Sequence, residues 1–323
     1  MSCEKKFSWS DFVTRRDALA MSGRVAGGAV LLLLLDRLGG ISRAIAETDQ
    51  LIVRRVPRTG EPIPVIGLGT AGVFDVDGDA AKRAELTQVL QILINGGGKV
   101  VDTASTYGSS EPVLGDLLAQ TGLRPKAFVA TKLESYELTE RGIRGCLERL
   151  HTKQIDLMQL HNVANPRQSL APFRAWKDQG LCRYIGITST YHNDYPAVEA
   201  VLRREKPDFL QIDYAIDNRE AEKRILPACA DLGVAVLTAL PLGHGRLLQA
   251  VRGRPLPDWA REFDAYSWPQ FFLKWVLGNP TITAVIPGTG NPKHMADNLG
   301  AGRGRLPDQK ERERMAQFVA SLS

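Results

Sequence analysis

Four side chains that could together move a proton to a carbonyl oxygen stand at the ends of apolar runs or just beyond them. Asp102 ends the run "KVVD", and Tyr107 follows five residues later. Lys132 ends "AFVATK", and His161 ends "IDLMQLH". A tyrosine, with a pKa of about 10, is a usable proton donor, and a nearby ammonium favours its phenolate. A carboxylate is the counter-charge that a buried ammonium needs, and a histidine can orient a carbonyl oxygen by a hydrogen bond.

The spacing of these residues places them on successive strand–helix units. Asp102, Lys132 and His161 are 30 and then 29 residues apart, and one such unit takes about 30 residues. Each residue alone fits an ordinary structural role as a turn cap, a solvated lysine or a core histidine. At the carboxyl ends of neighbouring strands they predict one shared site. Because none of the four can supply electrons, a hydride-carrying cofactor is also implied.

Short apolar runs alternate with helical segments after residue 50. Eight runs predict parallel strands that are buried on both faces: 65–70, 99–104, 127–132, 155–161, 184–189, 209–214, 234–240 and 283–289. Helices are expected over 81–96, 140–150, 194–205, 218–233 and 267–279. Eight strand–helix units in about 240 residues predict an α/β fold, a (β/α)8 TIM barrel, whose reactive side chains lie at the carboxyl ends of the strands.

The remaining segments complete one domain. A doubly wound open sheet is the alternative fold, but no helix here opens with the G-x-G-x-x-G pattern of its dinucleotide site. Residues 51–66 predict a β-hairpin before the first barrel strand, and 306–323 predict an additional C-terminal helix. No linker or change of composition follows residue 50, so we expect residues 47–323 to form a single domain.

The first 46 residues have the order of an export signal. Arg15 and Arg16 precede the apolar run 25–35, and "AIAE" (44–47) offers small residues for cleavage. This order predicts a twin-arginine signal peptide over 1–46, with the export machinery as a partner and a periplasmic or exported product. The run is about half the length of a membrane-spanning helix, so no stable span is expected in the mature form. An uncleaved membrane anchor and a basic tail are the alternatives.

Charge and cysteine content exclude other classes of protein. The chain has 41 Lys+Arg against 36 Asp+Glu; residues 1–46 contain seven and four of them, which leaves 34 against 32. A nucleic-acid partner is not expected, because it would require a clustered basic face. Cys3 lies in the signal segment. Cys146, Cys182 and Cys229 are too far apart for a CxxC or zinc pattern and predict buried free thiols, with no metal site.

Five motifs, in order, resemble the aldo-keto reductase superfamily over about residues 52–300. They are "DTASTYG" (102–108), "ATK" (130–132), "DLMQLHN" (156–162), "GITS" (186–189) and "IPGTGNPKHMADN" (286–298). The resemblance implies reduction of an aldehyde or ketone to an alcohol by a nicotinamide dinucleotide, usually NADPH, bound without a Rossmann domain. By the same resemblance Tyr107 is the proton donor, and Asp102 and Lys132 tune it. His161 positions the substrate carbonyl.

The resemblance also implies a cofactor site. Thr188, Ser189 and Gln211 fall where the family holds the nicotinamide carboxamide, with Thr and Ser in place of the commoner Ser and Asn. Gly288 and His294 stand where Lys and Arg often hold the 2′-phosphate. NADH therefore competes with NADPH, because an imidazole binds phosphate less well than a guanidinium. The full predicted set is Thr70, Thr188, Ser189, Gln211, Leu242, Gly243, Gly288, Thr289, His294 and Asn298.

Three further features border the expected site. Ala239 and Leu240 replace the aromatic that often stacks on the nicotinamide in the family, so aliphatic packing is expected there. His244, between two glycines, fits a phosphate contact and a loop filler equally. The three aromatics of "REFDAYSW" (261–268) could line a substrate pocket, but packing beneath the loop is favoured.

Two other functions compete with a carbonyl reductase. One is a cofactor-binding redox sensor with slow turnover, which some channel-associated members of the superfamily resemble. The other is a sugar-active barrel that works through paired carboxylates. Asp102 and Asp213 are the candidate acids at strand ends, and Lys132 beside Asp102 argues against that pairing. The presence of all four catalytic residue types favours the reductase.

Overall fold

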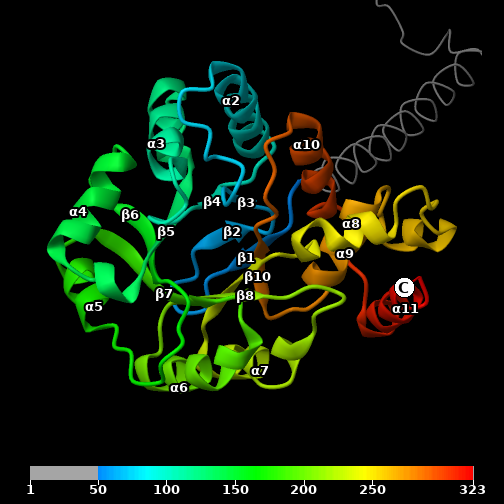
Figure 1. The fold of residues 1–323 in the computed structure, drawn as a ribbon. Coiled ribbons are helices and arrows are strands. Elements are labelled where there is room, and N and C mark those ends of the chain that lie inside the picture. Colours follow the sequence, from blue (N-terminus) through cyan, green and yellow to red (C-terminus); the bar gives the residue numbers. More distant parts are fainter. Residues whose placement is uncertain (1–49, 323) are drawn as a thin grey trace, which may run out of the picture. The chain divides into compact units, whose positions relative to one another are not determined.

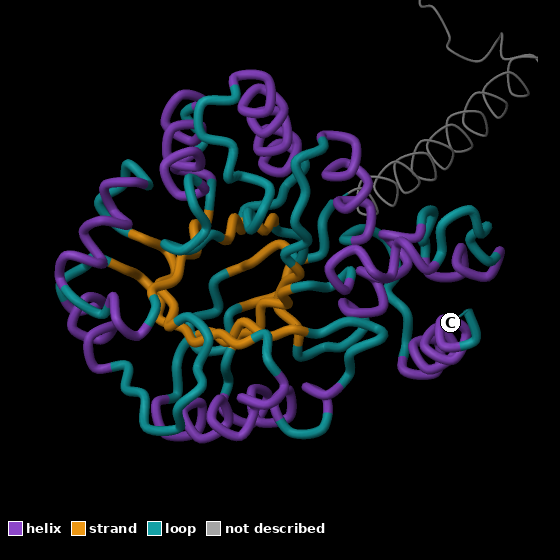
Figure 2. The backbone as a smooth tube through the Cα atoms, viewed as in Figure 1, coloured by secondary structure: helices purple, strands orange, loops and turns teal. Residues whose placement is uncertain are grey.

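The structure, a computed structural model, describes residues 50–322, so the expected signal peptide lies outside the described residues. From Leu51 onward the chain forms one compact unit. Its centre is a parallel sheet with strand order β10-β9-β8-β7-β6-β5-β4-β3, rolled into a barrel with helices around it (Figure 1). The (β/α)8 TIM barrel is therefore confirmed. The tube view shows the ring of strands enclosed by helices (Figure 2).

Each barrel strand overlaps one of the eight predicted runs. The strands are β3 (Leu68–Gly69), β4 (Val100–Asp102), β5 (Phe128–Leu133), β6 (Ile155–Leu160), β7 (Cys182–Ser189), β8 (Phe209–Asp213), β9 (Ala235–Ala239) and β10 (Ile282–Val285). Parallel bridges from Ile66 to Val285 and from Gly69 to Gly288 close the ring between β3 and β10. A Cβ on Gly69 would lie 2.9 Å from the carbonyl oxygen of Ile286, so this seam requires a glycine.

The helices surround the barrel on its outer side. They are α2 (Ala80–Asn95), α3 (Ser110–Thr121), α4 (Glu140–Arg149), α5 (Ala171–Asp178), α6 (Tyr195–Glu205), α7 (Ile225–Leu232), α8 (Arg246–Ala250), α9 (Trp268–Leu277), α10 (Pro292–Ala301) and α11 (Gln309–Ala320). The additional C-terminal helix is α11, as predicted. Within residues 50–322, no helix combines the length and apolar character needed to cross a bilayer.

The single helix expected over 218–233 is wrong in its first half. A short 3-10 turn occupies Glu220–Glu222, and α7 begins only at Ile225. The cause is Pro227, the third residue of α7. Its ring would collide with the carbonyl group four residues earlier, and it has no N–H to continue the helical hydrogen bonds. The helix therefore has to restart just before the proline.

The predicted hairpin closes one end of the barrel. Its strands β1 (Val53–Arg55) and β2 (Pro62–Pro64) pair antiparallel. Val56 and Ile63 of this hairpin belong to the same buried cluster as the barrel-interior side chains Phe128, Tyr184 and Phe209. The Phe128 and Phe209 rings lie 5.8 Å apart, centroid to centroid. Apolar groups fill this end of the barrel. The polar side chains of the expected site lie at the opposite end, where the strands have their carboxyl ends.

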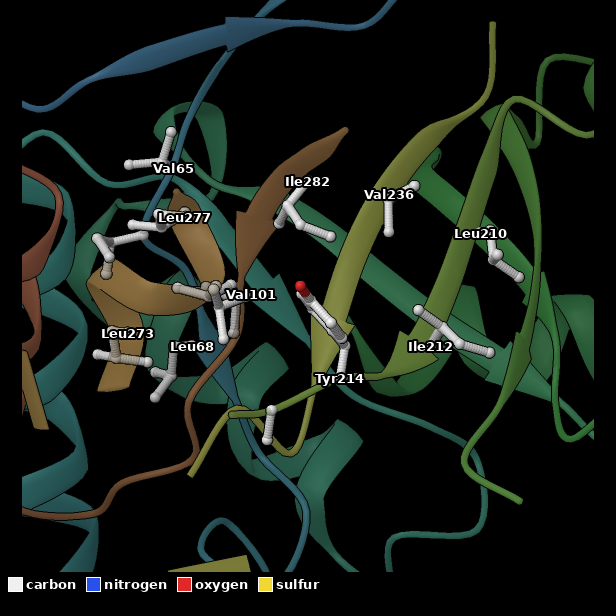
Figure 3. Packing of buried hydrophobic residues seen from close by; sticks show 14 of the residues in the cluster. Val65, Leu68, Val101, Leu210, Ile212, Tyr214, Val236, Leu273, Leu277 and Ile282 are labelled. Carbon is white, nitrogen blue, oxygen red and sulfur yellow. The ribbon is translucent and has the colours of Figure 1, made fainter. Parts of the chain in front are cut away.

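A second apolar layer joins the sheet to the helices. Figure 3 shows part of it, including Leu210 and Ile212 of β8, Val236 of β9 and Leu277 of α9, all buried. Burial of a side chain of this size stabilises the fold by about 1.5–3 kcal/mol. The strands are consequently apolar on both faces, as the sequence indicated.

Two smaller expectations concern this layer. The three cysteines of the described residues, Cys146, Cys182 and Cys229, are buried and free, as predicted. In the aromatic segment 261–268, Phe263 is buried and Trp268 packs against the core, whereas Tyr266 is exposed. Phe263 and Trp268 therefore pack against the core rather than line a pocket.

Candidate active site

A cavity of about 410 Å³ lies at the carboxyl ends of the strands. The four predicted catalytic side chains, Asp102, Tyr107, Lys132 and His161, all line it. Asp102 is the last residue of β4, and Lys132 is the fifth of the neighbouring strand β5. His161 directly follows β6, and Tyr107 lies in the loop after β4. The spacing of about one strand–helix unit brings these residues together because β4, β5 and β6 are adjacent in the sheet.

Lys132 and Asp102 form a buried ion pair at the centre of the site. Lys132 Nζ donates to Asp102 Oδ2 at 2.6 Å and to the carbonyl oxygen of Thr103 at 2.7 Å. Gln159 Nε2 donates to Asp102 Oδ1 at 3.4 Å. Burial alone lowers the pKa of Lys132, but the charges of Asp102 and Tyr107 act against it and leave that pKa above 10.5. Lys132 therefore stays an ammonium at neutral pH.

Tyr107 lies between this cation and the imidazole of His161. Lys132 Nζ is 5.0 Å from the centroid of the Tyr107 ring. The Tyr107 and His161 rings meet edge to face, with centroids 5.8 Å apart and planes at 77°. The phenol therefore has the Lys132 ammonium on one side and an imidazole on the other. The arrangement suits a proton donor to a carbonyl group held in the cavity.

The loop that carries Tyr107 is held by the loop after β3. Asp75 Oδ1 accepts hydrogen bonds from the backbone N–H and the hydroxyl of Ser109, each at 2.8 Å. Gly108, with φ of 57°, makes the turn between Tyr107 and Ser109. A side chain at position 108 would collide with the Asp75 carboxylate, so glycine meets both a conformational and a steric requirement.

His161 is neutral in this environment. Burial, and then the Lys132 charge, lower the pKa of its imidazole to about 3. A neutral imidazole carries one N–H and can donate one hydrogen bond from it. The chain turns sharply at the next residue, Asn162, which has φ of 48°. Thr188 Oγ1 accepts from the backbone N–H of Asn162 at 3.0 Å and so fixes the turn.

Four of the predicted cofactor residues line the same cavity: Thr188, Gln211, Leu242 and Gly288. Thr188 and Gln211 are paired in register on β7 and β8. Gln211 is 3% exposed, and its side-chain amide makes no hydrogen bond to another residue of the described range 50–322. An amide with an unused donor and acceptor is well suited to a carboxamide ligand.

The other predicted cofactor residues are not part of the cavity lining. The Ser189 hydroxyl accepts from the backbone N–H of Tyr191 at 3.2 Å, and the Thr289 hydroxyl accepts from that of Asn291 at 3.1 Å. Thr70 is buried beside the lining residues Gly69 and Ala71. Gly243 is a turn residue with φ of 58°. On α10, His294 is exposed and Asn298 is buried.

The loop after β9 supplies the apolar wall of the cavity. Ala239, Leu240 and Pro241 line it, as does His244, so the expected aliphatic groups occupy this wall. Leu240 has φ of 52° and His244 has φ of 55°. Holding a leucine in this left-handed conformation costs about 1–2 kcal/mol. Local strain of this kind is typical of segments kept in place for function.

Three polar residues near the cavity were absent from the sequence-based set. Asn162 and Thr190 line the cavity, and Glu134 lies against His161. Asn162 directly follows His161 in "DLMQLHN", and Glu134 stands two positions after Lys132. Proximity to a motif residue was the available sequence signal for both.

The buried ion pair predicts a specific pattern of stability. Lys132→Met leaves Asp102 buried and unpaired, which we expect to lower the free energy of unfolding at pH 7 by about 3–5 kcal/mol. The double variant Lys132→Met with Asp102→Asn removes both charges and should recover most of this loss. Urea unfolding measures both proteins. A double variant as unstable as the single one would contradict the interpretation.

The same pair predicts alkaline behaviour. The pKa of Lys132 is higher in the folded than in the unfolded protein, where it is about 10.5. Its contribution to stability is therefore complete below pH 10.5 and is lost as the pH rises through the folded pKa. Above pH 10.5 the wild type should lose more stability than the double variant.

Known proteins share both the sequence pattern and the fold. The model of the Aldo/keto reductase family matches residues 65–318. The aldo-keto reductase str7 of Strobilurus tenacellus is 26% identical over 292 residues, which are 75% of this chain and 83% of that protein. The aldo-keto reductase yakc [NADP(+)] of Schizosaccharomyces pombe is 24% identical over 302 residues, 78% of this chain and 88% of that protein.

Solved structures agree. An aldo/keto reductase from Klebsiella pneumoniae in complex with NADP and acetate has a TM-score of 0.67 at 24% identity, over 80% of this chain and 93% of that one. The thermostable aldo-keto reductase Tm1743, in complex with the inhibitor epalrestat, has a TM-score of 0.67 at 26% identity, over 84% of this chain and 100% of that one. Since the family model spans most of the chain, this protein belongs to the aldo/keto reductase family.

Proposed function

We propose that this enzyme reduces an aldehyde or ketone to the alcohol with NADPH, and that Tyr107 donates the proton. The observation that carries the proposal is the position of Lys132. Its ammonium is paired with Asp102 at 2.6 Å and lies 5.0 Å from the Tyr107 ring centroid, inside the cavity. A cation in this place stabilises the phenolate that proton donation leaves behind.

The cavity has the groups that a nicotinamide requires. A carboxamide needs both a hydrogen-bond donor and an acceptor, and the amides of Gln211 and Asn162 offer both. The flat ring needs apolar surface, which Ala239, Leu240 and Ile286 provide. These three classes of contact support nicotinamide binding at this end of the barrel. A nicotinamide dinucleotide, when bound, supplies the hydride for carbonyl reduction.

The chain's own residues would divide the remaining work among them. The neutral His161 holds the carbonyl oxygen by a hydrogen bond. Tyr107 Oη gives its proton to that oxygen as negative charge develops there. Lys132 stabilises the resulting phenolate, and Asp102 keeps Lys132 charged in a buried site. The apolar wall keeps bulk water away, which strengthens each of these interactions.

NADPH is the proposed form of the cofactor. The S. pombe relative is named for NADP(+), and the K. pneumoniae structure is a complex with NADP; both support the same choice here. NADH remains the alternative, since Gly288 has no side chain and His294 is an exposed imidazole. Binding constants for the two nucleotides, measured by fluorescence titration, distinguish them.

We also propose that residues 1–46 direct export through the twin-arginine route, which the order of charged, apolar and small residues supports. In a Gram-negative host, the wild-type protein should reach the periplasmic fraction. Replacing Arg15 and Arg16 by lysine should retain it in the cytoplasm, because the arginine pair is what this route reads. Wild-type protein found only in the cytoplasm would refute export.

Replacing Tyr107 by phenylalanine tests the proton donor. The variant keeps the ring that packs on His161 but has no proton to give. We expect kcat for small aldehydes to fall at least 100-fold, with the Kd for NADPH within about twofold of wild type. NADPH oxidation, followed by its absorbance, measures the rate. A rate within tenfold of wild type would exclude Tyr107 as the donor, and a wild type that binds NADPH without turnover would favour the redox sensor.

Replacing Gln211 by leucine tests the cofactor site. Because the amide has no partner within the described residues, its loss should leave the free energy of unfolding nearly unchanged. NADPH binding should weaken about tenfold, the effect of about one lost hydrogen bond. Gln317→Leu, at an exposed position on α11, is the matched control and should bind as wild type does. Equal affinity in the two variants would remove Gln211 from the site.

A further inference from the structure

Two glutamates that have no role in the mechanism above lie behind the catalytic side chains. Glu134 Oε1 is 2.8 Å from His161 Nδ1. Glu137 Oε2 accepts from the Ser105 hydroxyl at 2.7 Å and from the backbone N–H of Glu134 at 2.9 Å. The two acids thereby connect the loops after β4, β5 and β6. These are the loops adjoining the proton donor, the lysine and the histidine.

His161 Nδ1 depends on this carboxyl group. The atom is buried, and within residues 50–322 it has no hydrogen bond of good alignment. Glu134 Oε1 nonetheless lies at hydrogen-bond distance from it. Leaving a buried ring nitrogen unsatisfied would cost about 1–3 kcal/mol. At 2.8 Å the Glu134 carboxyl group is within reach of this nitrogen and can satisfy it.

The protonation of Glu134 decides which nitrogen of His161 carries hydrogen. An ionised Glu134 can only accept, so the imidazole proton would sit on Nδ1 and Nε2 would be an acceptor. A protonated Glu134 donates to Nδ1, and the imidazole proton then sits on Nε2. Only the second arrangement lets Nε2 donate a hydrogen bond to a carbonyl oxygen.

We propose that Glu134 is a positioning residue: its protonated carboxyl group donates a hydrogen bond to His161 Nδ1 and so keeps the imidazole in the Nε2–H tautomer. The consequence for catalysis, donation to the substrate carbonyl, rests on the proposed reductase function. The tautomer itself does not.

The surrounding charges support a proton on Glu134. Burial, and then the Glu137 charge, raise the pKa of Glu134. Burial, and then the Lys132 ammonium on β5, which is paired with Asp102 on β4 at 2.6 Å, lower the pKa of His161 and so keep the imidazole neutral. As the pH rises through the pKa of Glu134, its carboxyl group ionises and the imidazole proton moves to Nδ1. The donor facing the carbonyl is then lost on the alkaline side.

Nitrogen NMR of the full-length protein labelled with 15N-histidine tests the tautomer without any substrate. The His161 signals are assigned by their absence in His161→Gln. In wild type we expect the Nε2–H tautomer at low pH and a switch to Nδ1–H as the pH rises. Glu134→Leu should show no switch. Glu137→Gln removes the neighbouring charge and should move the switch about one pH unit lower. Glu148→Gln, at an exposed site on α4, should match wild type.

Kinetics give the second readout. Glu134→Leu should lower kcat for aldehyde reduction about tenfold, with the Kd for NADPH within twofold and circular dichroism unchanged. An Nδ1–H tautomer at every pH in wild type, or the same titration in Glu134→Leu, would overturn the proposal. If wild type reduces no carbonyl, the proposed function fails and the NMR result still decides the role of Glu134. If wild type reduces carbonyls and the His161 tautomer is the same in Glu134→Leu as in wild type, only this inference fails.

Discussion

The ion pair between Lys132 and Asp102 is the interaction on which the rest of the site depends. A lysine that is 2% exposed is tolerated only with a close counter-charge and further hydrogen bonds, and Asp102 with the Thr103 carbonyl supplies them. The same ammonium lies beside the Tyr107 ring and helps to hold the pKa of His161 at about 3. One buried cation therefore lies against the phenol of Tyr107 and helps to keep His161 neutral.

The barrel provides the geometry that this pair requires. Parallel strands end at the same edge, so residues about 30 positions apart in the chain meet across one cavity. The hairpin of β1 and β2 fills the opposite end together with the buried rings of Phe128, Tyr184 and Phe209. Aliphatic side chains of the loop after β9 complete the wall. The polar groups are thus gathered at one end, where Asp102, Lys132 and His161 are each buried and their charges and hydrogen bonds act more strongly than in water.

Much of this arrangement can be predicted from the amino-acid sequence alone. The eight strands, the hairpin, the C-terminal helix and the grouping of Asp102, Lys132 and His161 at one cavity follow from runs of apolar residues and from repeat spacing. These are local features, because a buried strand must be apolar wherever it occurs. The helix over 218–233 shows the limit of periodicity alone, since Pro227 interrupts a pattern that otherwise reads as continuous.

What the tertiary structure decided is which side chains meet. Thr188 faces the cavity and its neighbour Ser189 does not, because successive side chains of a strand point to opposite faces and the register with β8 selects the face. The sequence indicated a carboxamide site but not this division. The contact of Glu134 with His161 joins two loops 27 residues apart. Loop conformations, such as the positive φ of Leu240, are set by packing around them. The nearness of Glu134 to Lys132 in the sequence marked it as a neighbour of the site, but its contact with His161 depends on how the two loops fold.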